Sequence, residues 1–224
     1  MMTLPDLMKA LKIEDESTPD TERAAKGHKG TVKAVFLDRD GVLNEDTGYI
    51  GRKEELIVIP RAKEAIDGLR GLGYSIVVTT NQAGMGKGLY TKEDFLKVME
   101  GLQGKLGGSG AWDRVYFCPF HSEAVIERYR CYHVDRKPEP GMHLRAALEM
   151  DIDLPSSIMV GDHIKDVIAA HRAGCRSALV MTGRGKEELR EVLEEGVMPG
   201  DERYPDLICE DLYNVYLALK EGAI

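Results

Sequence analysis

From residue 33 onward the chain alternates short apolar runs with longer amphipathic stretches. The apolar runs cover residues 34–37, 75–78, 115–117, 158–160, 178–180 and 207–208, and each has the length of a buried strand. Apolar residues recur at helical spacing between and after these runs, over residues 62–72, 91–106, 142–150, 165–173, 187–195 and 212–220. This alternation is typical of a parallel sheet covered by helices. We therefore predict one α/β domain over residues 31–224.

The first 30 residues differ from the rest and form an N-terminal extension. Leu4, Leu7, Met8 and Leu11 have helical spacing, whereas residues 14–29 are rich in charged and polar side chains. We predict a short helix followed by a linker. The pattern leaves open whether this extension is a disordered tail or docks on the domain or on a partner.

Composition and charge limit the partners of the chain. A net charge of −8 would repel the phosphate backbone of nucleic acid. No stretch approaches the roughly 20 apolar residues of a membrane helix, and the first residues lack the features of a secretory signal. We expect a cytoplasmic monomer that acts on a small molecule, without nucleic acid or membrane. Its four cysteines are then expected to bind metal or to be buried, rather than to form disulfides.

The first apolar run leads directly into two carboxylates, Asp38 and Asp40, followed by Gly41. Two carboxylates at this spacing can bind a hard cation, or can act as a nucleophile and an acid/base. Gly41 allows the tight backbone turn that would point both groups to one side. An ordinary turn with solvated acids would show the same three residues. The motif therefore needs support from the rest of the chain.

Three later motifs also carry groups that suit phosphate or a cation, and each follows an apolar run or precedes a predicted helix. Their main residues are Thr80, Asn81, Arg136, Lys137 and Asp162. In an open α/β sheet, loops beyond the carboxyl ends of the strands converge on one crevice. We expect these side chains to lie near Asp38.

Taken together, the four motifs resemble those of the haloacid dehalogenase superfamily of phosphatases, over about residues 33–220. The resemblance implies a Rossmann-like parallel sheet with helices on both faces, and an aspartyl-phosphate intermediate. By this comparison Asp38 is the nucleophile, Asp40 the acid/base, Thr80 a phosphate-binding hydroxyl and Lys137 the phosphate-clamping cation. The implied Mg²⁺ ligands are Asp38, the backbone carbonyl of Asp40, and Asp162. The loops at 44–60 and 118–135 are too short for a lid domain, so we expect a minimal cap.

A closer similarity is to the group of heptose 1,7-bisphosphate phosphatases and histidinol-phosphatases. It is carried by residues 36–41, 80–82, 118–119 and 136–138. The substrate-binding residues that it implies are Asp46, Gly48, Tyr49, Asn81, Arg136 and His163. His163 departs from the group, which often has lysine there. The similarity implies hydrolysis of D-glycero-D-manno-heptose 1,7-bisphosphate, a precursor of lipopolysaccharide. Histidinol-phosphatase or broad phosphatase activity, and a non-catalytic phosphate-binding regulatory module, are the alternatives.

The same group holds a structural zinc in a loop with Cys and His ligands. Here the corresponding Cys2His2 set would be Cys118, His121, Cys131 and His133. The loop departs from the group, because Phe120 stands where a ligand is expected and two extra residues precede Arg136. Either a closed tetrahedral Zn²⁺ site braces this loop, or the loop has lost its metal. Cys175 and Cys209 lack nearby partners and are expected to be core residues.

Overall fold

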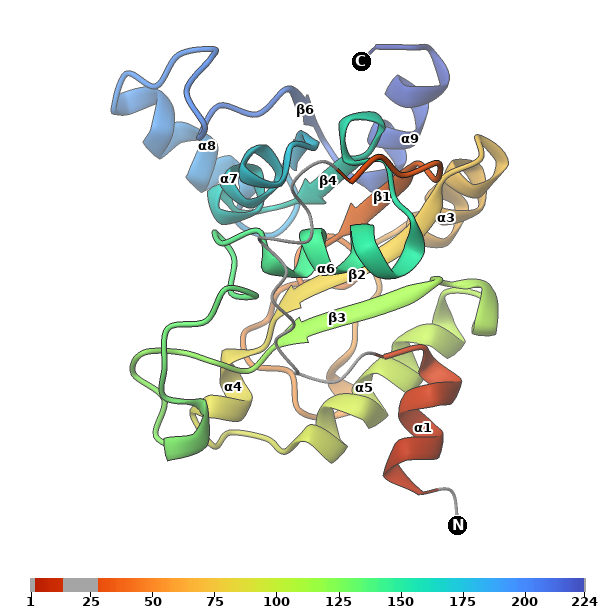
Figure 1. Ribbon diagram of the computed structural model, residues 1–224, viewed down its shortest axis with the longest axis vertical. Coiled ribbons are helices and arrows are strands. Elements are labelled where there is room, and N and C mark those ends of the chain that lie inside the picture. The colour runs from red at the N-terminus through yellow and green to blue at the C-terminus, as the bar shows by residue number, and fades with distance from the viewer. Residues whose placement is uncertain (1–2, 14–27, 224) are drawn as a thin grey trace.

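The computed structural model describes residues 3–13 and 28–223 (Figure 1). Within these residues, six parallel strands form one sheet in the order β3-β2-β1-β4-β5-β6. The strands are β1 (Ala34–Leu37), β2 (Ser75–Asn81), β3 (Arg114–Cys118), β4 (Ile158–Gly161), β5 (Arg176–Val180) and β6 (Leu207–Cys209). Each coincides with a predicted apolar run, and the predicted α/β fold is confirmed.

Helices cover both faces of the sheet. They are α3 (Ala62–Gly71), α4 (Ala83–Gly86), α5 (Lys92–Lys105), α6 (Gly141–Met150), α7 (Ile164–Ala173), α8 (Gly185–Glu194) and α9 (Leu212–Lys220). Successive side chains of a strand point to opposite faces. Val35 and Leu37 therefore pack in the core under α3, α5 and α9, whereas Ala34 and Phe36 pack against α6 and α7. Every residue of β1 is buried, as expected for the centre of a parallel sheet.

The N-terminal helix α1 (Leu4–Leu11) docks on the domain. The Thr3 side chain caps the helix by accepting a hydrogen bond from the Asp6 amide. The helix packs against α5 (Figure 1). Leu11 is buried, and its carbonyl accepts a 2.8 Å hydrogen bond from the indole nitrogen of Trp112. Of the two alternatives for the extension, residues 3–13 adopt the docked one. The greater part of the predicted linker, residues 14–27, lies outside the described residues.

Docking of the N-terminal segment also covers the edge of the sheet. Among the described strands, β3 pairs with β2 alone, which leaves its outer edge available for pairing. Ile13 bridges to Val115, whose amide donates to the Lys12 carbonyl at 2.9 Å. Covering an edge strand in this way protects it from pairing with another chain.

Only short elements lie above the carboxyl edge of the sheet. The described residues of the two loops at 44–60 and 118–135 contain the 3₁₀ turns Lys53–Glu55 and Glu127–Tyr129. Two further 3₁₀ turns, Gly108–Gly110 and Leu154–Ser156, lie elsewhere. The cap is thus minimal, as predicted. Among the described residues, no helix is long and apolar enough to cross a membrane.

Candidate active site

A cavity of about 350 Å³ opens at the carboxyl edge of the sheet. Its walls come from the turn after β1, the end of β2, the loop before α6, the first turn of α7 and the loop after β5. These segments are far apart in the sequence, and the parallel sheet brings them together because its strand ends share one edge. The motifs singled out in the sequence therefore meet at a single place.

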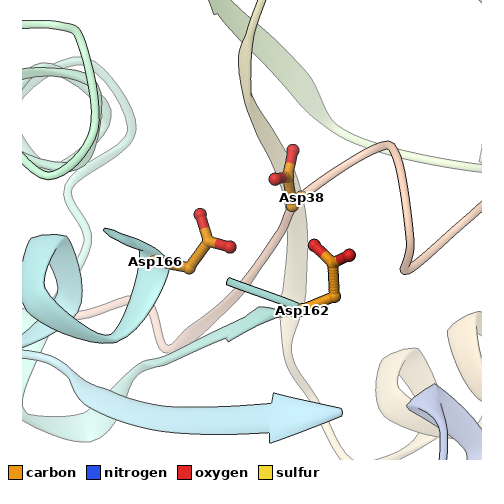
Figure 2. A group of neighbouring side chains, drawn as sticks. All are labelled: Asp38, Asp162 and Asp166. Atoms are coloured by element: carbon orange, nitrogen blue, oxygen red, sulfur yellow. The ribbon is translucent and has the colours of Figure 1, made fainter. Parts of the chain in front are cut away.

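Three carboxylates gather on one side of this cavity. Asp38 follows β1, Asp162 follows β4 and Asp166 lies in the first turn of α7, and one oxygen from each lies within 4.8 Å of the others. Figure 2 shows the three side chains around a common space. Burial, together with the charges of Asp38 and Asp166, raises the pKa of Asp162 to about 8. Burial likewise raises the pKa of Asp38 to about 6, against the opposing charge of Lys137. Such a group suits a hard divalent cation.

Two glycines make room for Asp162. Gly41 has a φ of +77°, and a Cβ there would lie 2.1 Å from Asp162 Oδ2. Gly183 has a φ of +53° and would bring a Cβ equally close to the same oxygen. Only glycine adopts these conformations without strain and without collision. The Asp162 carboxylate is thus enclosed by two turns, and it accepts a 2.9 Å hydrogen bond from the Arg184 amide.

The three carboxylates form the acidic side of the cavity, and Lys137 is the cation that lies among them. Its side chain is 1% exposed, and its ammonium lies 3.0 Å from Asp38 Oδ2 and 2.6 Å from Asp166 Oδ1. It also donates to the Thr79 carbonyl at 2.9 Å. Asn81 fixes the Lys137 backbone, donating to its carbonyl at 3.0 Å and accepting from its amide at 3.1 Å. Asn81 therefore positions Lys137, as well as lining the cavity.

Asp40 lines the cavity but is held firmly by its neighbours. Both of its oxygens accept from the Arg39 guanidinium at 2.8–3.1 Å, and Arg39 is itself 1% exposed. Asn44 and Gln82 donate to the same carboxylate at 2.9 and 3.3 Å. Every one of these partners is a donor, which suits the ionised form of Asp40.

Thr80 lies behind the cavity wall rather than on it. Its side chain is buried, and its hydroxyl accepts a 2.8 Å hydrogen bond from Gln82. The Gln82 amide oxygen accepts in turn from the Tyr90 hydroxyl at 2.6 Å. Gln82, which does line the cavity, therefore lies between Thr80 and Asp40.

All of the predicted substrate-binding residues line the cavity; they are Asp46, Gly48, Tyr49, Asn81, Arg136 and His163. Nδ1 of His163 lies 2.8 Å from Glu188 Oε2 and 3.3 Å from the Lys165 amide. One ring nitrogen cannot donate to the first and accept from the second, and the shorter contact to the carboxylate is the stronger. His163 is thereby tethered to α8.

Several residues of the wall were not predicted from the sequence, among them Lys165 and Asp166. A signal for Asp166 was present, because it lies four residues after Asp162 in the first turn of a predicted helix. Lys165 precedes it, and burial lowers the pKa of its ammonium. The charge of Asp166 raises this pKa, whereas Lys137 and Arg136 lower it.

The geometry does not support the predicted zinc site of Cys118, His121, Cys131 and His133. Within the described residues, the carboxylates around Asp38 are the only group of three or more potential metal ligands. The His133 ring stacks on Phe120 with centroids 4.0 Å apart. Cys118 is buried at the end of β3, whereas Cys131 is exposed. The aromatic ring at position 120 thus packs where a ligand was expected.

Comparisons with known proteins agree with this geometry. The family model described as haloacid dehalogenase-like hydrolase matches residues 5–174. The D-glycero-alpha-D-manno-heptose-1,7-bisphosphate 7-phosphatase of Burkholderia mallei is 41% identical over 153 residues, which cover 68% of this chain and 81% of that protein. The D-glycero-D-manno-heptose-1,7-bisphosphate 7-phosphatase of Thermosynechococcus vestitus is 40% identical over 80% of this chain and 91% of its own.

A solved structure gives the same result for the fold. The D,D-heptose 1,7-bisphosphate phosphatase from B. bronchiseptica, crystallised with magnesium and phosphate, matches with a TM-score of 0.73 at 31% identity. The match covers 85% of this chain and 99% of that one.

Proposed function

The chain belongs to the haloacid dehalogenase-like hydrolases and is a phosphatase, and we propose that it removes the C7 phosphate of D-glycero-D-manno-heptose 1,7-bisphosphate. The observation that carries the proposal is the convergence of Asp38, Asp162 and Asp166 with Lys137 in one cavity. The substrate is inferred from relatives that are 36–41% identical and are named for this activity.

The donor set fits Mg²⁺. Three ionised carboxylates and one ammonium leave two negative charges, and all of the side-chain donors are oxygens. Both Asp166 oxygens are already engaged, one by Lys137 and one by the His163 amide at 3.2 Å. By the family resemblance we assign Asp38, Asp162 and the Asp40 carbonyl as ligands, and the 2.6 Å contact gives Asp166 the role of positioning Lys137. When bound, Mg²⁺ offsets the repulsion between the Asp38 carboxylate and an anionic phosphate.

Asp38 carries the covalent chemistry. Its carboxylate is fixed at both oxygens, one near Lys137 and the other accepting from the Arg39 amide at 2.7 Å. Attack on phosphorus forms a bond from Asp38 to the phosphoryl group and breaks the bond to the sugar oxygen. Water then cleaves the aspartyl-phosphate, which releases inorganic phosphate and restores Asp38. Lys137 offsets the charge on the transferring oxygens.

Asp40 moves the protons. A sugar alkoxide is a poor leaving group, so a proton from Asp40 is needed as the bond to phosphorus breaks. The observed contacts with Arg39, Asn44 and Gln82 suit the carboxylate form, which takes the proton of the attacking water in the second step. In the protonated form, one carboxyl oxygen gives up its Arg39 contact and can donate instead.

A substrate panel tests the activity. We expect the highest kcat/KM for one anomer of the heptose bisphosphate, so both anomers should be compared with histidinol phosphate and simple phosphate esters. A clear preference for histidinol phosphate would overturn the substrate assignment. Binding of phosphate without turnover of any ester would indicate a regulatory module.

The Asp38→Asn variant tests the mechanism. Turnover should fall by at least about 1,000-fold because the amide is not a nucleophile, while an unchanged Tm shows that the fold is intact. Near-normal activity in this variant would refute a covalent intermediate on Asp38.

A further inference from the structure

Five cationic side chains line the cavity, and three of them have carboxylate partners. Lys137 pairs with Asp38 and Asp166, Arg39 pairs with Asp40, and Arg184 lies 3.6–3.7 Å from two glutamates of α8. The other two are Arg136 and Lys165. Within residues 3–13 and 28–223, no carboxylate lies within ion-pair distance of either. These two cations therefore lack the neutralisation that the others have.

The two cations also have few hydrogen-bond partners among the described residues. The Arg136 guanidinium donates to the Phe120 carbonyl at 3.1 Å, and the described part of the chain offers no hydrogen-bond partner to the Lys165 ammonium. Burial lowers the pKa of both groups, so each is partly removed from water. Holding an unpaired cation away from water costs free energy, which a bound anion would offset.

Both side chains line the cavity, and together they form what we call its basic side. Lys87 donates to the hydroxyl of Tyr49, which lines the cavity. The acidic side, by contrast, has Lys137 for the phosphate that reacts. A second anion would balance the charges of Arg136 and Lys165.

We propose that Lys165 and Arg136 form a second anion subsite, which binds the phosphate of a bisphosphorylated substrate that is not cleaved. Lys165 is then the specificity-determining residue for bisphosphates over monophosphates. The neighbouring His163 cannot take this role, since its ring is tethered to Glu188 at 2.8 Å. The inference rests on the proposed function and names the group that selects its substrate.

Three variants separate this role from a structural one. Lys165→Gln removes the charge, Lys165→Arg restores it, and Lys186→Gln removes an exposed lysine of α8 outside the cavity. For the heptose bisphosphate, kcat/KM of Lys165→Gln should fall by about 10–100-fold, mainly through KM, as expected for losing a charged hydrogen bond. For p-nitrophenyl phosphate it should change less than about twofold. Lys165→Arg should recover most of the loss, and Lys186→Gln should match the wild type.

Two results would overturn the subsite. Equal losses on both substrates would mean that Lys165 acts at the reacting phosphate or on the fold. No loss on either would mean that Lys165 binds no anion.

A second measurement tests the subsite independently of the proposed substrate. Hexose 1,6-bisphosphate and hexose 6-phosphate can each be tested as inhibitors of p-nitrophenyl phosphate hydrolysis, whether or not the enzyme cleaves them. The bisphosphate should bind more tightly to the wild type, and Lys165→Gln should abolish that difference. The wild type could fail to hydrolyse heptose bisphosphate and still bind hexose 1,6-bisphosphate more tightly than hexose 6-phosphate. In that case the substrate assignment fails and the subsite stands. Equal inhibition of the wild type by the two sugars would refute the subsite.

Discussion

The loop that carries Arg136 and Lys137 is braced by a buried ion pair, and this brace gives a sharp prediction. Asp135 lies 3.3 Å from the Arg145 guanidinium of α6, and the side chains are only about 2% exposed. The N-terminus of α6 packs closely on the loop, because a Cβ on Gly141 would lie 2.6 Å from Asp135 Oδ1. The pair thus joins the loop to α6.

Truncation of Asp135 to alanine should destabilise the protein strongly. Breaking a buried ion pair by removing one partner costs about 3–5 kcal/mol, and this is the upper limit here because Arg145 keeps a 3.9 Å contact with Glu149. For a chain of this length the loss corresponds to a fall in Tm of about 6–20 °C. Burial raises the pKa of Asp135 despite the charge of Arg145, which shows how strongly water is excluded here.

Thermal unfolding of Asp135→Ala and of a matched surface variant measures this effect. Glu195→Ala removes the partner of Arg203 in an exposed pair at 2.7 Å. Such a pair contributes about 0–1 kcal/mol, so Tm should fall by less than about 4 °C. Below its Tm, Asp135→Ala should also lose about 10–100-fold in kcat/KM, because a displaced loop misplaces Lys137.

The competing explanation is a zinc brace, and the same experiment distinguishes it. If zinc held the loop, a zinc-selective chelator in excess Mg²⁺ would lower Tm, and Asp135→Ala would behave like Glu195→Ala. That pair of results would refute the ion-pair brace. A large loss in Asp135→Ala with no effect of the chelator would support it.

Two further predictions concern the metals. Burial raises the pKa of Asp162 to about 8 and that of Asp38 to about 6, both above the ordinary value of 3.8. The folded metal-free protein thus retains protons that the unfolded chain has lost, and its stability should fall as pH rises from about 4 to about 8. Mg²⁺ must displace these protons when it binds. Its apparent Kd, measured by calorimetry, should therefore fall by about tenfold per pH unit between pH 6 and 8. A pH-independent Kd would contradict the assigned ligands. Metal analysis of protein purified without added zinc should find less than about half an equivalent of zinc, whereas a full equivalent would restore the predicted Cys2His2 site.

The strands and the acidic motif could be predicted because their causes are local. A strand buried on both faces of a parallel sheet must be apolar throughout, so the apolar runs could be recognised as strands. Asp38 and Asp162 follow such runs directly, and the sharing of one edge by all strand ends then brings them together. The sequence also contains the reason for Gly41, although only the structure shows that the Asp162 carboxylate fills the space beside it.

The loop around residue 120 could not be predicted because its packing depends on distant residues. The spacing of Cys118 and His121 is compatible with a metal, but it does not show that the His133 ring stacks on Phe120. Nor does it show that Asp135 meets Arg145, a residue of the following helix. Burial of a charged pair follows from tertiary packing, which no local pattern records.

The division of the cavity into an acidic and a basic side constrains the order of events. Once Asp38 and Asp162 are ionised, the acidic side carries two negative charges with Lys137 included, and a bound cation is needed to offset them before a phosphate approaches Asp38. The basic side needs no such preparation, since Arg136 and Lys165 are already cationic. A bisphosphate can therefore be held first through its uncleaved end, which raises the local concentration of the reacting phosphate. After cleavage the sugar loses its phosphate contacts on the acidic side, and this loss of one anchor favours its release over rebinding.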